Sequence, residues 1–341
     1  MHAIFSEIQN EHAPKRYLRY GALTDYPESP ERMRRLIAGA EKAGLELREP
    51  DQFDRGHLEG VHSRRYLDFL EHGHAEWMKL PGAFPEIMPS ARPVERPSAY
   101  PTHILGRAGW HIMDFAGAVT AQTWNTVRMS AASALTAAEL VATGADAAYA
   151  LCRPPGHHAY GERCGGFCYL NNSAIAAQYL RRKYERVAVL DIDVHHGNGT
   201  QAIFYDRADV LTVSIHADPA VYYPFFYGHA EQRGAAAGEG FNLNLPVPVK
   251  SGDRVWIAAL ETAVKRIADF APGALVLALG LDAHEADPLD GGAVTTEGFT
   301  VMARIIAGIG LPTVLVQEGG YLTPMLGDNL AAFLTAFRTA R

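Results

Sequence analysis

The stretch that decides the fold is VAVLDIDVHHGNGT, residues 187–200. It opens as an unbroken apolar run, which is typical of a parallel strand buried on both faces, and then changes abruptly to polar residues. Side chains two positions apart share a face of an extended chain, so Asp191, Asp193 and His195 point the same way. Two carboxylates on one buried face require a cation to neutralise them. The stretch therefore predicts a buried strand that ends in a metal site.

Four other apolar runs of this kind occur in the chain, and segments of helical periodicity separate them. The predicted strands are 147–152, 187–192, 211–215, 274–279 and 313–317. The predicted helices are 30–43, 64–71, 125–143, 172–185, 254–270, 296–307 and 328–339, with Asn172 and Asp328 as expected N-caps. Alternating strands and helices predict an α/β protein with a mostly parallel sheet between helices.

Polar clusters directly follow four of these strands. They are RPPGHH at 153–158, the 191–200 segment, GLD at 280–282 and EGGY at 318–321. Open parallel sheets bind their ligands at the carboxyl ends of the strands, so the four clusters are expected to meet at one edge. We therefore place the chemistry of the protein there.

Asp193, His195 and Asp282 make a three-ligand metal site in this arrangement. Three protein ligands leave one position for water, which is the mark of a catalytic metal. Two carboxylates and one histidine would accept Fe²⁺ among the divalent ions.

His157 and His158 lie on a turn stiffened by two prolines and a glycine, where both rings can face the same water. The partners available to orient them are Asp191, a carboxylate that stabilises an imidazolium, and Asn198, an amide that does not. Tyr321 follows two glycines and can donate a hydrogen bond to a developing oxyanion.

Composition restricts the class of protein. The 341 residues carry a formal net charge of −7 and contain no block of Lys and Arg, so we expect no nucleic-acid partner. The three cysteines, Cys152, Cys164 and Cys168, form no disulfide framework and indicate a reducing compartment. We expect no secretory signal in the first dozen residues, no membrane span and a cytoplasmic location.

A stretch with a proline at every fourth position interrupts the alternation of strands and helices. The prolines are Pro81, Pro85, Pro89, Pro93, Pro97 and Pro101. Such a density excludes a helix interior or a central strand. Two interpretations stay open: a surface loop, or an ordered insertion that walls a site or packs on another subunit.

These motifs resemble the histone deacetylase superfamily. The resemblance rests on RPPGHH at 153–158, GGFCYLNN at 165–172, DIDVHHGNGT at 191–200, LD at 281–282 and EGGY at 318–321. The segments 214–219 and 226–234 and the proline-rich insertion resemble its bacterial acetylpolyamine amidohydrolase branch.

The resemblance implies an arginase/deacetylase fold: one domain over 1–341, a central eight-stranded parallel sheet flanked by helices, and a proline-rich insertion at about 73–105. It implies Zn²⁺ on Asp193, His195 and Asp282, and a homodimer. His157 would hydrogen-bond to Asp191 and His158 to Asn198, which makes His158 the expected general base. Other implied residues are Tyr321 at the acetyl carbonyl, Gly166 and Phe167 lining the acyl tunnel with Tyr223 opposite, and a structural K⁺ on Asp191, Asp193, His195, Ser214 and Ile215.

The implied reaction is removal of acetyl groups from small N-acetylated amines, such as acetylputrescine or acetylcadaverine, by metal-activated water. Leu105 stands where the resemblance leads us to expect an acidic residue for a distal ammonium. Deacetylation of acetyl-lysine in proteins or peptides is the main alternative. A ureohydrolase would need a second carboxylate two residues after Asp282, where Ala283, His284 and Glu285 follow instead. A non-catalytic protein that only binds an acetylated ligand would have lost a catalytic residue, and none of those named above is missing.

Overall fold

The sheet that organises the molecule has eight strands within residues 1–93 and 99–341, the part of the chain that the computed structural model describes. Every strand pair in it is parallel, and the order is β4-β1-β5-β10-β9-β6-β7-β8. The strands are β1 (His2–Ile4), β4 (Glu46–Arg48), β5 (Ala147–Ala150), β6 (Val187–Asp191), β7 (Val210–Ala217), β8 (Asn242–Val247), β9 (Ala274–Leu279) and β10 (Thr313–Gln317). This confirms the predicted eight-stranded parallel sheet.

The five strands predicted individually are those in the middle of the sheet. All residues of β6, β7, β9 and β10 are buried, as the unbroken apolar runs require. The edge strands β4 and β8 are partly exposed and have no such run, so their sequences carry a weaker signal.

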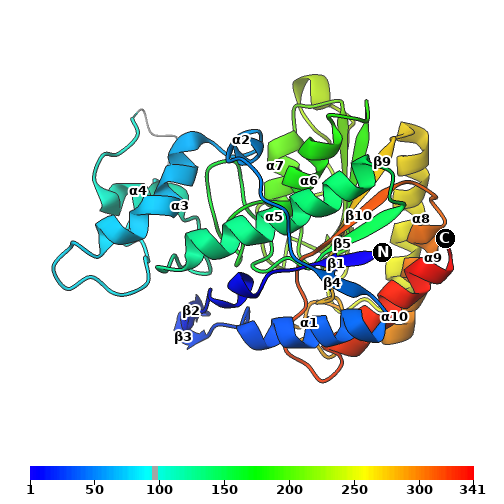
Figure 1. Ribbon diagram of the computed structural model, residues 1–341, viewed down its shortest axis with the longest axis horizontal. Helices are drawn as coiled ribbons and strands as arrows, with labels where there is room; N and C mark the ends of the chain where they lie inside the picture. The colour runs from blue at the N-terminus through cyan, green and yellow to red at the C-terminus, as the bar shows by residue number, and fades with distance from the viewer. Residues whose placement is uncertain (94–98) are drawn as a thin grey trace.

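Helices cover both faces of the sheet, as Figure 1 shows. Residues of α1 (Pro30–Lys42), α8 (Asp253–Phe270), α9 (Thr296–Ala307) and α10 (Leu326–Thr339) share one apolar core with the sheet. Residues of α5 (Thr123–Ala142), α6 (Asn172–Leu180) and α7 (Asn198–Phe204) share the other. Side chains of β9 alternate between the two cores, because successive residues of a strand face opposite sides.

Two predicted helix caps are wrong. Asn171, not Asn172, caps α6: its Oδ1 accepts a hydrogen bond from Ala174 N at 2.9 Å. The Asn172 amide instead donates to Ser130 Oγ and Pro154 O, which holds α6 against neighbouring segments. Asp328 lies inside the first turn of α10, where it pairs with Lys42 of α1 at 2.8 Å.

A smaller set of elements lies beside the sheet and outside its two helical layers. It comprises the hairpin β2 (Arg16–Arg19) and β3 (Ala22–Asp25), the helices α2 (Gly56–Glu59), α3 (Arg64–Trp77) and α4 (Ile104–His111), and the loop between α3 and α4. In the described part of that loop, Ile87 is fully buried and its N–H donates to Val119 O at 2.8 Å. Pro97 lies outside the described residues.

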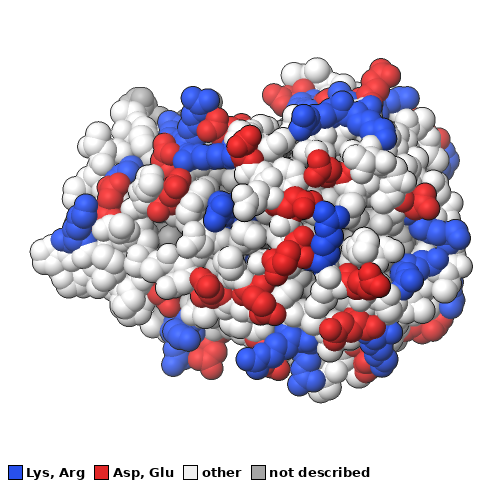
Figure 2. Space-filling model, viewed as in Figure 1, with Lys and Arg blue, Asp and Glu red and all other residues white. Residues whose placement is uncertain are grey.

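Charged side chains of both signs are interspersed on the face shown in Figure 2. None of the described helices is both long enough and apolar enough to span a bilayer.

Candidate active site

The site lies at the carboxyl ends of β5, β10, β9 and β6, which are consecutive neighbours in the sheet. Each of these strands passes directly into one of the four polar clusters. Parallel strands bring those ends to the same edge, so the fold places the clusters side by side.

Asp193, His195 and Asp282 form a buried group of three donors whose ligand atoms all lie within 4.8 Å of one another. His195 Nδ1 lies 3.0 Å from Asp193 Oδ1 and 3.2 Å from Asp282 Oδ2. The other oxygen of each carboxylate accepts a backbone N–H, Gly319 N at 2.7 Å for Asp193 and Val194 N at 2.9 Å for Asp282. One oxygen of each carboxylate and one ring nitrogen therefore converge, as a metal site requires.

The charges in this group favour a cation. Burial and the neighbouring Asp193 raise the pKa of Asp282 above its ordinary value. Two adjacent buried carboxylates repel each other unless a positive charge lies between them. The three residues fit a divalent ion such as Zn²⁺ in type, number and spacing.

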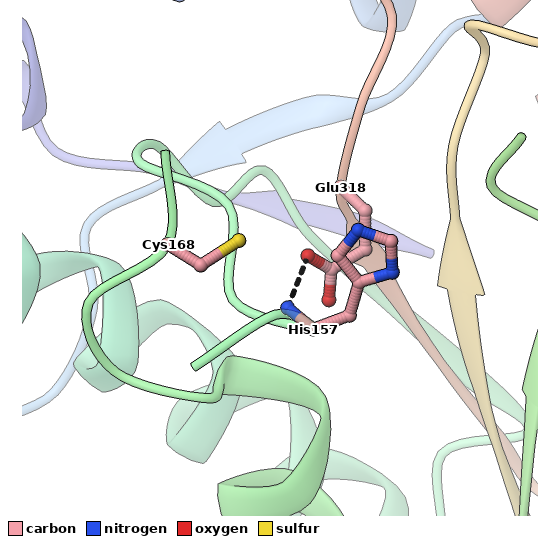
Figure 3. Close-up of side chains that lie close together, drawn as sticks. All are labelled: His157, Cys168 and Glu318. Atoms are coloured by element: carbon pink, nitrogen blue, oxygen red, sulfur yellow. Dashed lines mark hydrogen bonds between the residues drawn. The ribbon is translucent and has the colours of Figure 1, made fainter. Parts of the chain in front are cut away.

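A second buried group, His157, Cys168 and Glu318, also has donor atoms within 4.8 Å of one another (Figure 3). Its chemistry does not suit a metal. Both oxygens of Glu318 already accept hydrogen bonds from the protein. Burial raises the pKa of the Cys168 thiol well above its ordinary value, so the sulfur stays protonated and is a poor ligand.

His157 and His158 stand next to each other, with ring centroids 4.0 Å apart. His157 Nδ1 lies 2.9 Å from Asp191 Oδ2, and His158 Nδ1 lies 2.6 Å from Asn198 Oδ1. These are the partners that the resemblance implies.

The two histidines differ in charge because their partners differ. Burial opposes a charge on His157, but the carboxylates of Asp191 and Asp193 outweigh it and raise the pKa of His157 to about 10. Burial and the positive charge of His157 lower the pKa of His158 well below its ordinary value. At neutral pH His157 is charged and His158 is neutral.

Tyr321 is 4% exposed and lies at the end of the short segment that follows β10. Gly319 approaches the metal group so closely that a Cβ there would collide with the carboxylates of Asp193 and Asp282. The N–H of Tyr321 donates to Asp287 Oδ2 at 2.8 Å. Burial raises the pKa of Tyr321 well above its ordinary value, so the phenol remains a hydrogen-bond donor.

A cavity of about 550 Å³ opens onto these residues. His158, His195 and Tyr321 line it together with the three predicted tunnel residues Gly166, Phe167 and Tyr223. Its remaining walls are Tyr17, Leu18, Arg19, Tyr20, Asp114, Phe115, Ala116, Val221, Tyr222, Phe225 and Leu289.

Known proteins match this chain over nearly its whole length. The sequence pattern of the histone deacetylase domain matches residues 26–337. The acetylpolyamine amidohydrolase of Burkholderia pseudomallei is 46% identical over 337 residues, which cover 99% of this chain and 98% of that protein.

The chain belongs to the histone deacetylase family. Another relative, the acetylpolyamine amidohydrolase of Mycoplana ramosa, is 40% identical over 98% of both chains. The crystal structure of the acetylpolyamine aminohydrolase from Burkholderia pseudomallei has a TM-score of 0.96 at 45% identity and covers 100% of this chain and 99% of that chain. The HDA15 HD domain has a TM-score of 0.80 at 25% identity and covers 99% and 90%, respectively. These similarities confirm the predicted arginase/deacetylase fold.

Asp114 is the functional candidate that the sequence analysis missed in this deacetylase-family chain. Its Oδ2 accepts hydrogen bonds from Tyr223 Oη at 2.7 Å and from Gly166 N at 2.9 Å, so it joins two predicted walls of the cavity. No polar strand end surrounds it in the sequence, and its partners lie 52 and 109 residues away. The linear sequence therefore gave no signal for it.

The remaining predicted positions, Leu105, Ser214 and Ile215, lie in α4 and β7. Leu105 lies in α4, 45% exposed, and is not among the described residues that line the cavity. Ser214 lies opposite Asp191 in the pairing of β6 with β7, and Ile215 follows it. Tyr222, which was not predicted, stacks on His195 with ring centroids 5.2 Å apart.

Proposed function

We propose that this protein is a metal-dependent amidohydrolase that removes the acetyl group from small N-acetylated amines, in particular acetylpolyamines such as acetylputrescine and acetylcadaverine. The observation that carries the proposal is the content of one cavity. His195 of the three-donor metal group, a neutral histidine and a protonated tyrosine all line it.

We assign the metal to Asp193, His195 and Asp282, with Zn²⁺ as the ion; Fe²⁺ suits the same donors. A divalent ion bound there supplies Lewis acidity, which activates water and polarises a carbonyl.

His158 is the proton acceptor in this proposal. Asn198 Oδ1 can only accept a hydrogen bond, so the neutral His158 carries its proton on Nδ1 and donates it there. Its Nε2 is then left with a free lone pair. That nitrogen can take a proton from water and later give it to the departing amine.

His157 and Tyr321 stabilise negative charge. Asp191 holds His157 in its charged form, and that charge keeps the neighbouring His158 neutral. The Tyr321 phenol donates to the oxyanion that forms when the amide carbonyl is attacked.

The cavity walls favour a thin, linear substrate. Aromatic rings and the bare backbone of Gly166 surround the route to the metal group. Asp114 is the carboxylate that we find among the described lining residues, and its charge suits the distal ammonium of a monoacetylated diamine. We also propose the potassium site at Asp191, Asp193, His195, Ser214 and Ile215 and a cytoplasmic homodimer, on the family resemblance.

The test compares kcat/KM for acetylputrescine and acetylcadaverine with that for an acetylated histone-tail peptide. We expect the small amines to be preferred. A preference for the peptide of about tenfold or more, which is about 1.4 kcal/mol in transition-state binding, would favour the acetyl-lysine deacetylase instead.

A further inference from the structure

Glu318 is a fully buried carboxylate for which the reaction described above has no use. It is the first residue after β10 and has 0% exposure. Figure 3 shows its carboxylate pointing to the backbone of His157 rather than to the histidine ring. An ionised carboxylate in the interior is costly unless hydrogen bonds compensate for the lost water, so its bonds indicate its task.

Three donors from the protein satisfy Glu318. Its Oε2 accepts from Gly156 N at 2.6 Å and from His157 N at 3.0 Å, and its Oε1 accepts from Ser173 Oγ at 2.7 Å. Two consecutive backbone N–H groups form a concave anion site, and here the anion is a side chain of the same protein. Glu318 thereby ties the turn that carries both histidines to β10 and to the first turn of α6.

The turn is closely packed against the segment that precedes α6. A Cβ on Gly156 would collide with backbone atoms of Leu170 and Asn172. Without an acceptor at Glu318, the N–H groups of Gly156 and His157 would remain buried with no compensating bond, and the turn would have to shift to satisfy them.

The segment that begins with Glu318 also fixes the other parts of the site. Gly319 N donates to Asp193 Oδ2, and Tyr321 is three residues beyond Glu318. Arg32 of α1 donates to the carbonyl oxygens of Glu318 and Gly320. One short segment is therefore bonded to the metal group and to the histidine turn, and it carries the tyrosine.

We propose that Glu318 is a positioning residue: its bonds to the backbone of the histidine turn set the rings of His157 and His158 relative to Tyr321 and the metal group. The proposal rests on the proposed deacetylase function. Glu318 acts through the turn, since its oxygens are bonded to the turn and to α6.

The decisive comparison is between Glu318→Ala and Glu318→Gln. Alanine removes every acceptor, and a displacement of about 1 Å at a reacting group costs roughly 10² in rate, so kcat should fall by about that factor. Glutamine can accept both N–H groups with its oxygen and donate to Ser173 Oγ with its nitrogen. It should keep kcat within about tenfold of wild type. KM should stay within about twofold in both variants, because the side chain that is replaced does not line the cavity.

Asp253, which does not line the cavity, offers a matched control. Like Glu318, it accepts a backbone N–H and a hydroxyl, from Thr295 N at 2.8 Å and Thr295 Oγ1 at 2.7 Å. Asp253→Ala should lower the melting temperature and leave kcat unchanged. If it lowers kcat as much as Glu318→Ala does, loss of stability explains both effects and the positioning role is refuted.

Wild-type turnover separates this proposal from the one on which it rests. Absence of acetylputrescine hydrolysis counts against the proposed substrate, and the variants are then compared on whichever acetylated substrate the wild type hydrolyses. A Glu318→Ala kcat within about threefold of wild type overturns the positioning role, as does a folded Glu318→Gln that is as slow as Glu318→Ala.

If Glu318→Ala does not fold, Ser173→Ala replaces it. That variant frees one carboxylate oxygen and should lower kcat severalfold at constant KM, and an unchanged kcat would refute the proposal.

Discussion

Two regions meet at the cavity, and they are built differently. The strand-end region (153–158, 191–200, 280–287 and 318–321) holds its reactive side chains by hydrogen bonds from buried backbone and polar groups. The outer region comprises the β2–β3 hairpin, α2 to α4 and the segment 112–118. Its residues that line the cavity come from the hairpin and from 112–118 and include the rings of Tyr17, Tyr20 and Phe115. Tyr17 and Tyr26 pack on Phe167 with ring centroids 5.5 and 4.9 Å apart. Sheet register places the chemistry, whereas packing between distant segments shapes the entrance.

This difference predicts different responses to mutation. Changes in the strand-end region should reduce turnover for every substrate, because they alter the reacting groups. Changes in the outer region should alter the choice of substrate, because they alter the walls. The expected effects on activity decrease from the metal group to the cavity wall.

The largest loss should follow damage to the metal group. Asp282→Asn removes one of two converging carboxylates, and a catalytic metal contributes several kcal/mol, so we expect kcat to fall by roughly 10³ or more. Chelation should abolish activity, and one equivalent of Zn²⁺ or Fe²⁺ per chain should restore it. A need for two tightly bound equivalents of transition metal would overturn the mononuclear assignment.

The histidine pair should show an asymmetry. His158→Ala removes the neutral acceptor, and general acid–base catalysis contributes roughly 10² to 10⁴, so a loss in that range is expected in kcat. His157→Ala should cost less, because His157 acts through its charge. Equal losses in the two variants, measured at saturating substrate, would contradict the separate roles.

Tyr321→Phe keeps the ring and removes only the hydroxyl. Loss of one oxyanion donor costs roughly 10² to 10³ in kcat. Steady-state kinetics on acetylputrescine provide the test. Near-normal turnover would mean that the hydroxyl does not stabilise the intermediate.

The same division explains what the sequence could predict. Asp193, His195 and Asp282 follow unbroken apolar runs, and the side-chain alternation of strands and the rule for strand ends together locate them. Asp114 follows no such pattern, since a hydrogen bond to Tyr223, 109 residues later, places it. The caps predicted at Asn172 and Asp328 were wrong for a related reason. The Asn172 amide bonds to Ser130 instead, and α10 begins at Leu326, so that Asp328 lies in its first turn and pairs with Lys42.

In the outer region, Asp114→Asn should change selectivity rather than chemistry. The asparagine oxygen can still accept from Tyr223 and Gly166, but its amide nitrogen cannot accept from Ala116 N. The variant therefore removes the charge and one backbone hydrogen bond. We expect kcat/KM for acetylputrescine to fall by about tenfold, and that for the neutral analogue N-butylacetamide to stay within about twofold. Tyr223→Phe, which leaves the charge in place, should keep the preference for the cation. An equal loss on both substrates in Asp114→Asn would instead assign it a purely structural role.

A different kind of effect, on stability, concerns the contact between the outer region and the N-terminus of α6, which we call the junction. His62, between α2 and α3, is 1% exposed, and its Nε2 accepts a hydrogen bond from Asn171 N at 2.9 Å.

Burial lowers the pKa of His62 from 6.5 to about 4. Between these two values the unfolded chain binds more protons at this position than the folded protein does. The contribution of His62 to stability is therefore complete above pH 6.5 and declines as the pH falls towards 4. Each tenfold difference in proton affinity is about 1.4 kcal/mol, so the total loss is about 3 kcal/mol.

His62→Gln tests this junction directly. Glutamine can accept the same bond from Asn171 without becoming charged, so the variant should lose less stability than wild type on going from pH 7 to pH 4. The measurement is the free energy of unfolding by urea at several pH values in that range. His72→Gln is the control, because the His72 side chain is 63% exposed, and it should follow the wild-type curve. If His62→Gln also follows that curve, acid lowers the free energy of unfolding through other groups. The junction is then no more sensitive to pH than the rest of the protein.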